Sequence, residues 1–136
     1  MDHINLLKSH GLKATPQRLC VLKILARHEH PTIDELFESI KKDYPSISLA
    51  TVYKNLNTLL DEGLVVEVNT PNQKSKFDIY EIPHLHVVCE KCGSVMDVGM
   101  EDNLMVNFQE KVEKRISNLV KKFNLVATVC DCEHCR

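Results

Sequence analysis

The sequence has no long apolar run and no secretory signal. No segment approaches the roughly 20 consecutive apolar residues that a transmembrane helix needs, and the start, Met-Asp-His-Ile-Asn, lacks the basic and apolar regions of an export signal. We therefore expect a cytoplasmic protein whose six cysteines are reduced thiols or metal ligands and not disulfides. The formal net charge of −2 neither indicates nor excludes a nucleic-acid partner, because binding depends on where the cations lie.

The first half of the sequence predicts three helices with clear start signals. Thr15 is a typical N-cap, and Pro16 suits the first helical position. Residues 32–35 (TIDE) have the capping-box pattern. Ser48 caps a third segment, which Gly63 ends. Apolar residues recur at helical spacing in the three segments: Leu19, Leu22 and Leu25; Leu36, Phe37 and Ile40; Val52, Leu56, Leu59 and Leu60.

The opposite side of the 48–63 helix is polar and nearly free of acids. Its members are Ala50, Thr51, Lys54, Asn57 and Thr58. Most helices have a solvated side, but the lack of acids, with Tyr53 and Lys54 near the helix start, favours contact with DNA bases. Lys13 and Arg18 flank the first cap, where they could neutralise phosphates. The predicted DNA-binding residues are therefore Lys13, Arg18, Thr51, Tyr53, Lys54 and Asn57.

A predicted β-hairpin follows the helices. Its strands are the β-rich runs 64–68 and 76–82, joined by a turn-like segment at 70–74. Three helices followed by a hairpin are the element order of a winged helix-turn-helix. Pro83 marks the predicted joint to a second unit, so we assign residues 1–83 to a winged-helix DNA-binding domain.

Residues 84–136 predict a smaller α/β domain for dimerisation and metal binding. Its expected elements are strands at 86–89 and 95–98, a long helix from 102 to about 122, and a last strand at 125–130. The helix has an apolar seam formed by Phe108, Val112, Ile116, Leu119, Val120 and Phe123. About 50 residues cannot cover that much apolar surface alone, which suggests a dimer. The predicted fold class of the chain is α+β.

Two Cys-x-x-Cys pairs lie in this smaller domain: Cys89 and Cys92, then Cys132 and Cys135. Each pair can hold one side of a cation, and together they supply the four thiolates of a structural Zn²⁺ site. The alternative is two redox-active pairs, but such a pair usually begins a helix in a βαβ unit, and here the first lies between strands. Cys130 offers a competing ligand. We expect Cys20 in the core and His134 in solvent.

A second metal site is indicated by His84 and His86. They lie two positions apart in an extended segment, so their rings project to the same side. Asp78 and Asp97, in neighbouring predicted strands, add carboxylates. Imidazoles with carboxylates suit Fe²⁺ or Mn²⁺ better than a soft-ligand metal. A third imidazole would complete five ligands and leave one octahedral position open, but the residue pattern alone does not identify it.

Four segments in order resemble the ferric uptake regulator (Fur) family, and the resemblance covers essentially the whole chain. They are residues 11–18 (GLKATPQR), 30–36 (HPTIDEL), 48–56 (SLATVYKNL) and 84–93 (HLHVVCEKCG). The sequence is most similar to the peroxide-stress repressor (PerR-like) branch, because Asp97 stands where iron-uptake regulators tend to have glutamate. Two residues depart from the family pattern: Asn124 stands where a histidine often holds a further metal, and Lys54 where arginine is common.

The resemblance implies a metal-dependent repressor with five ligands for a regulatory Fe²⁺ or Mn²⁺: His30, Asp78, His84, His86 and Asp97. It also implies a homodimer that binds a double-stranded DNA operator, expected to be an AT-rich inverted repeat. In the PerR-like branch the signal is hydrogen peroxide. Peroxide reacting at Fe²⁺ would add oxygen to a ligand histidine, His30 or His84, so that the metal and then the operator are released. Mn²⁺ would support repression without this oxidation.

Other interpretations stay open at this point. An iron-responsive Fur regulator with reversible Fe²⁺ binding would share the fold and the sites. A non-haem iron oxygenase could use the same histidines and carboxylates, but it would leave the winged-helix half unexplained. A zinc-built interaction module without a DNA role is a further alternative. We expect a regulator and not an enzyme.

Overall fold

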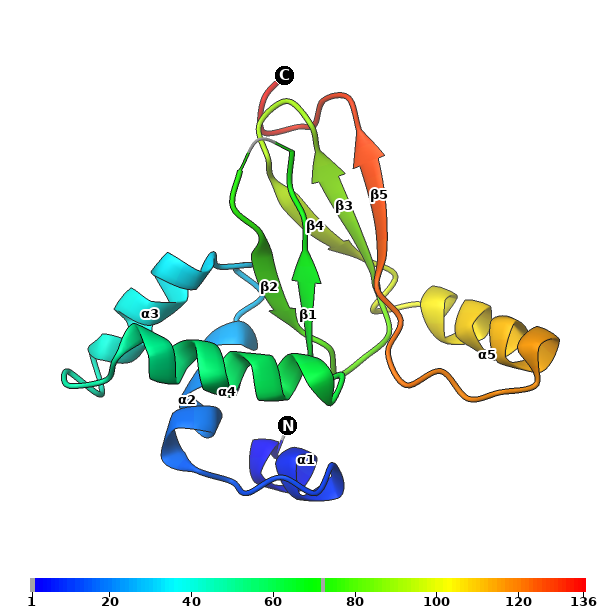
Figure 1. Cartoon of the computed structure of the whole chain (residues 1–136). Helices are drawn as coiled ribbons and strands as arrows, with labels where there is room; N and C mark the ends of the chain where they lie inside the picture. Colours follow the sequence, from blue (N-terminus) through cyan, green and yellow to red (C-terminus); the bar gives the residue numbers. More distant parts are fainter. Residues whose placement is uncertain (1, 72) are drawn as a thin grey trace.

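The computed structural model describes residues 2–71 and 73–136, so Met1 and Asn72, a residue of the predicted turn at 70–74, lie outside the described residues. Within that part of the chain, helices α1 to α4 gather on one side of the β1–β2 hairpin, a second sheet stands beside the hairpin, and α5 projects away from both (Figure 1). No helix of the described ranges is long and apolar enough to cross a bilayer.

The predicted start signals of the first two helices form real caps. Helix α2 (Pro16–Leu25) begins after Thr15, whose side chain accepts a hydrogen bond from a backbone amide of the first turn. Helix α3 (Ile33–Lys41) begins with a complete capping box, in which Thr32 and Glu35 satisfy each other's backbone amides. The Thr15 cap fixes the start of α2, and the capping box fixes the end of the loop that joins α2 to α3.

The predicted 48–63 helix is confirmed as α4 (Leu49–Asp61), capped by the Ser48 side chain. Gly63 follows it with a φ of 77°, the left-handed conformation that glycine tolerates best. The sequence analysis did not specify α1 (His3–Ser9), although Asp2 caps it by accepting from two backbone amides. This helix packs on α2 and extends the helical half by one element.

The core of the helical half is built from the apolar sides of α2, α3 and α4 and from the hairpin. Its most buried members include Leu22, Leu25, Leu36, Ile40, Val52, Leu56, Leu59 and Ile79. Cys20 lies in this core, as expected of a small apolar side chain. The apolar positions at helical spacing in the sequence are therefore the ones that face inward.

The hairpin consists of β1 (Val65–Val68) and β2 (Lys76–Ile79), paired antiparallel. Strand β2 is shorter than the predicted run 76–82. Its side chains alternate between two buried faces: Phe77 and Ile79 join the helical core, and Asp78 points to the other side, fully buried. A fully buried aspartate on a strand requires charged or hydrogen-bonding partners.

The second sheet has the order β4–β3–β5, with β3 (Leu85–Cys89) at the centre. Strand β4 (Val95–Val98) pairs antiparallel with β3, and β5 (Leu125–Val129) pairs parallel with it. The C-terminus of the chain lies at the same end of this sheet as the β3–β4 turn (Figure 1). The central strand carries His86 and Cys89, so it contributes to both predicted metal sites.

The long helix predicted from 102 to about 122 is shorter in the structure. Helix α5 (Leu104–Ile116) ends where Ser117 turns left-handed, with a φ of 55°. After this point the Glu113 carboxylate accepts a hydrogen bond from the Val120 backbone amide at 2.7 Å, which stabilises a turn in place of a further helical turn. Only Met105 of α5 is buried. The predicted apolar seam is therefore split between a helix and an irregular segment.

Candidate metal centres

The four cysteines of the two Cys-x-x-Cys pairs converge beyond the end of β3. The sulfur–sulfur distances are 3.6 Å from Cys89 to Cys135, 3.5 Å from Cys92 to Cys132, and 3.8 Å from Cys132 to Cys135. A tetrahedral zinc with Zn–S bonds of about 2.3 Å places its sulfurs about 3.8 Å apart, whereas a disulfide bond measures about 2.05 Å. The geometry therefore fits a zinc ion. Cys130 is exposed and lies outside this group.

The surroundings of Cys92 favour deprotonated sulfur. Gly93, with a φ of 78°, turns the chain so that its amide donates to the Cys89 carbonyl at 2.8 Å. The Ser94 hydroxyl lies 2.9 Å from the Cys92 sulfur, and this hydrogen bond lowers the pKa of the Cys92 thiol to about 6. Thiolate is the form that binds zinc. His134, between the last two cysteines, is exposed as expected.

A second cluster collects side chains from four segments of the chain. His30 lies in the loop between α2 and α3, and Asp78 lies in β2. His84 directly precedes β3, His86 lies within it, and Asp97 lies in β4, opposite His86 in the strand register. The five residues that the family resemblance implied are thus brought together, although they span most of the sequence.

The distances in this cluster are those of neighbouring metal ligands. Asp78 Oδ2 lies 2.8 Å from Nε2 of both His84 and His86, and these two nitrogens are 3.0 Å apart. Asp97 Oδ1 lies 2.8 Å from His30 Nε2 and 3.3 Å from His86 Nε2. Adjacent ligands of an octahedral ion with bonds of about 2.1 Å are about 3 Å apart. In four residues, all but His84, the ligand atoms all lie within 4.8 Å of one another.

The cluster is buried, and its charges compensate one another. Burial lowers the pKa of the imidazoles, but hydrogen bonds to Asp78 and Asp97 outweigh this effect and raise the pKa of His30 to about 9 and of His84 to about 10. Burial raises the pKa of the carboxylates, yet the histidines hold the pKa of Asp97 at about 2 and that of Asp78 far below its usual range. A divalent cation could take the place of the imidazole protons.

The donor set fits a borderline or hard divalent ion. The Nδ1–H of His84 donates to the Ile82 carbonyl at 2.7 Å, which leaves Nε2 directed toward the carboxylates as a ligand atom. Nδ1 of His86 is buried without a hydrogen-bond partner among the described residues, so the orientation of that ring depends on the cluster itself. Imidazoles and carboxylates together suit Fe²⁺ or Mn²⁺.

A further residue of the cluster, His28, was missed by the sequence analysis. Its Nδ1 lies 3.0 Å from Asp78 Oδ1 and 3.2 Å from Asp97 Oδ2. These are the carboxylate oxygens that face away from the other histidines. A signal existed in the sequence, because His28 and His30 repeat the two-residue spacing of His84 and His86.

The predicted DNA-binding residues lie on an accessible surface of the helical half. Thr51, Tyr53, Lys54 and Asn57 are exposed along α4. Lys13 is exposed in the loop before α2, and Arg18 is half-buried, with its guanidinium donating to the Lys13 carbonyl at 3.1 Å. Arg18 is therefore partly engaged in holding this loop.

The sequence model of the ferric uptake regulator family matches residues 9–127. The chain belongs to this family. Among its Fur-family relatives is the peroxide-responsive repressor PerR of Staphylococcus saprophyticus, 43% identical over 97 residues. That match covers 71% of this chain and 66% of the relative, just under two thirds of its length.

Solved structures of Fur-family proteins share the fold. The Campylobacter jejuni peroxide stress regulator is 60% identical, with a TM-score of 0.78 over 99% of this chain and 100% of that one. The Pseudomonas aeruginosa ferric uptake regulator with manganese is 29% identical, with a TM-score of 0.72 over 98% of this chain and 99% of that one. The expected α+β fold and the resemblance to the PerR-like branch are confirmed.

Proposed function

We propose that this protein is a metal-dependent transcription repressor that releases its operator when hydrogen peroxide oxidises a histidine of its regulatory metal site. The observation that carries this proposal is the buried cluster of three histidines and two carboxylates at the distances of neighbouring ligands. The similarity of the chain to the Campylobacter jejuni peroxide stress regulator, at 60% identity, supports hydrogen peroxide as the signal. An iron-responsive regulator is the rival that the same cluster would allow.

The two clusters have different roles in this proposal. Cys89, Cys92, Cys132 and Cys135 hold a structural Zn²⁺ that stabilises the small C-terminal domain, residues 84–136. The regulatory Fe²⁺ or Mn²⁺ is held by His30, Asp78, His84, His86 and Asp97. The manganese in the Pseudomonas aeruginosa ferric uptake regulator supports the choice of ion.

The regulatory ligands lie on both sides of the joint at Pro83. His30 and Asp78 belong to the proposed DNA-binding domain, 1–83, whereas His86 and Asp97 belong to the second sheet. Side chains that share one ion hold the two domains in one relative orientation, and loss of a ligand frees them. In a two-fold dimer this orientation sets the distance between the two α4 helices, which must match successive major grooves.

The oxidation step acts on the ligands themselves. Bound Fe²⁺ would supply the electrons that cleave the peroxide O–O bond, which Mn²⁺ does not supply. In the net reaction one peroxide oxygen enters a C–H bond of the His30 or His84 ring, and the other leaves as water. The oxidised ring is less basic and therefore a weaker ligand. The hydrogen bond from His84 to the Ile82 carbonyl keeps that ring in place during the reaction.

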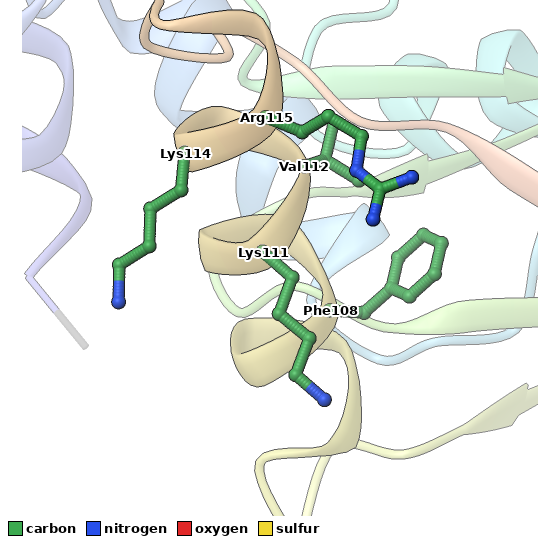
Figure 2. A pocket seen from close by; sticks show the side chains of 5 residues that line it. All are labelled: Phe108, Lys111, Val112, Lys114 and Arg115. Carbon is green, nitrogen blue, oxygen red and sulfur yellow. The ribbon is translucent and has the colours of Figure 1, made fainter.

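Homodimerisation is proposed from the apolar surface of the second domain. Leu104 is 52% exposed and Ile116 is 56% exposed, which is unusual for large apolar side chains of a monomer. Figure 2 shows Phe108 and Val112 on the same side of α5, in a groove that Lys111 and Arg115 also line. This groove lies outside the metal clusters, so we assign it to contact with a second copy of the chain.

DNA binding is proposed for the exposed side of α4, with Thr51, Tyr53 and Asn57 at base edges and Lys13, Arg18 and Lys54 near phosphates. The proposed partner is double-stranded DNA with an AT-rich inverted repeat, which the protein binds in the cytoplasm. Lysine at position 54 contacts phosphate as a point charge and is less suited than arginine to paired hydrogen bonds with a base.

The test compares zinc-loaded protein without a regulatory metal, with Fe²⁺ and with Mn²⁺, each before and after peroxide. Binding to the promoter region of its own gene is measured by fluorescence anisotropy at fixed salt. We expect both metals to promote binding and peroxide to release only the Fe²⁺ form. Release by a chelator but not by peroxide would favour the iron-responsive rival.

Mass spectrometry checks the chemistry of the same samples. We expect a gain of about 16 Da on a histidine peptide in the Fe²⁺ form only. Trypsin leaves His28 and His30 in one peptide, because cleavage follows Arg27, and it leaves His84 and His86 in another. Fragmentation must therefore assign the modified ring. Equal oxidation with both metals, or oxidation of cysteines alone, would contradict the proposal.

A further inference from the structure

We infer that His28 is a positioning residue of the regulatory metal site, which holds the outer oxygens of Asp78 and Asp97 so that their inner oxygens face the ion. The inference rests on the proposed function, because it concerns the same metal. His28 is not one of the five ligands, and its side chain is 31% exposed, against 0% for Asp78 and 13% for Asp97. It therefore lies between the two carboxylates and solvent.

Each carboxylate divides its two oxygens between the cluster and His28. Oδ2 of Asp78 faces the nitrogens of His84 and His86 at 2.8 Å, and its Oδ1 lies 3.0 Å from His28 Nδ1. Oδ1 of Asp97 faces His30 at 2.8 Å, and its Oδ2 lies 3.2 Å from the same His28 nitrogen. One nitrogen thus contacts the outer oxygens of both carboxylates.

The hydrogen-bonding capacity of these groups fixes the proton on His28. An ionised carboxylate has only acceptor atoms, so a nitrogen between two of them must carry a hydrogen and donate it. The Nδ1–H of His28 therefore donates to both aspartates. A carboxylate bound in this way has one oxygen occupied and is less able to turn and bind an ion with both oxygens.

The backbone around His28 is built to present this ring. His28 and His30 both have left-handed φ values, 55° and 52°, which are uncommon for residues other than glycine. The His28 amide donates to the Leu25 carbonyl at 3.0 Å, and the Pro31 carbonyl accepts from the Phe77 amide at 2.9 Å. The loop is thus fixed at one end to α2 and at the other to β2, next to Asp78.

This role predicts an effect on the metal itself. Hydrogen-bond partners of metal ligands typically change metal affinity by 10-fold to 100-fold when they are removed. Without His28, a carboxylate could rotate and bind with both oxygens, so that the number of ligand atoms at the ion would change. A purely structural role for His28 would lower stability and leave both properties unaltered.

The experiment compares His28→Asn with His28→Gly in zinc-loaded, full-length protein. Both residues tolerate the left-handed backbone. The amide nitrogen of asparagine can reach the place of histidine Nδ1 and donate, whereas glycine has no donor. Mn²⁺ affinity is measured from the electron paramagnetic resonance of the free ion, and ligand number from the visible absorption of Co²⁺. His10→Ala, at an exposed histidine remote from the cluster, is the control.

We expect His28→Gly to weaken Mn²⁺ binding by 10-fold to 100-fold and to change the Co²⁺ spectrum, while His28→Asn and His10→Ala resemble the unaltered protein. Unchanged affinity and spectrum in His28→Gly would overturn the inference and leave the proposed function intact. Equal losses in His28→Asn and His28→Gly would also overturn it, because the donor would then not matter. Failure of the unaltered protein to bind Mn²⁺ would overturn both proposals.

Discussion

Replacing Asp78 with asparagine isolates the charge on which the regulatory cluster depends. Asp78 is fully buried and accepts hydrogen bonds from His84 and His86, both at 2.8 Å, while asparagine has the same shape without the charge. In zinc-loaded protein without a regulatory metal, the protonated imidazoles of His30 and His84 balance this charge. We therefore expect Asp78→Asn to destabilise that form, by an amount that depends on pH.

The size and sign of the effect follow from the pKa of His30. That pKa is raised from 6.5 to about 9, so its contribution to stability is fully present below pH 6.5 and is lost as the pH rises through about 9. At 1.36 kcal/mol per pKa unit, the interaction of His30 with both carboxylates contributes about 3 kcal/mol near pH 6 and less than about 1 kcal/mol near pH 9. Asp97 remains 2.8 Å from His30 in Asp78→Asn, so this figure is the upper bound of the loss through His30. His84 contacts the same carboxylates, so the stabilisation that corresponds to its raised pKa cannot be added in full to that of His30. The lowered pKa of Asp78 describes the same interaction from the other partner.

Urea unfolding at pH 6 and pH 9 measures this difference, at one protein concentration because the protein is proposed to dimerise. Asp34→Asn is the matched control: it removes a carboxylate from an exposed ion pair with Lys74, where solvent screens the charges and we expect little change in stability at either pH. Zinc content is checked in every sample. A gap between the unaltered protein and Asp78→Asn that is equal at both pH values, or larger at pH 9, would refute the reasoning.

Four further outcomes are expected. Cys132→Ser should release zinc and unfold the C-terminal domain, measured by zinc content and circular dichroism, because a structural zinc contributes on the order of 10 kcal/mol; retained zinc would contradict the assignment. Lys54→Ala should weaken operator binding at every salt concentration and lower the salt slope by about 1 without altering Mn²⁺ affinity. Asp97→Glu adds one methylene, which should let the carboxylate reach the open octahedral position of the regulatory metal. Mn²⁺-dependent operator binding should then persist, while release of the Fe²⁺ form from the operator by peroxide slows by about tenfold. Phe108→Asp should shift the protein from dimer to monomer in sedimentation experiments.

Local signals predicted the helical half well because each acts over a few residues. The capping box of Thr32 and Glu35, the Thr15 cap before α2 and the Ser48 cap before α4 depend only on hydrogen bonds within one turn, and all three appear in the structure. The zinc site could be predicted in the same way, because two Cys-x-x-Cys pairs with equal spacing can bind one ion. The sequence pattern and the structure agree where the physics is local.

Features that depend on long-range packing were harder to predict from the sequence. Asp78 and Asp97 were predicted as metal-site residues from their neighbouring strands, but His30 came only from the family resemblance, because its approach to Asp97 depends on tertiary packing. His28 was overlooked for the same reason: its role appears only when two carboxylates from different strands stand beside it. The predicted end of this helix, at about residue 122, was wrong. The apolar pattern of a helix continues in the sequence, but the Glu113 side chain accepts from the Val120 backbone amide and stabilises a turn there.

Strand β2 has no solvent-facing side at its centre, and this limits how a signal can spread. Phe77 and Ile79 pack into the helical core beside α2, and the residue between them reaches the ion-binding cluster. A shift of that single strand would disturb both neighbours at once. In the proposed mechanism, communication from the metal site to the helical half then needs no chain of distant intermediaries, because the two are separated by the thickness of one backbone.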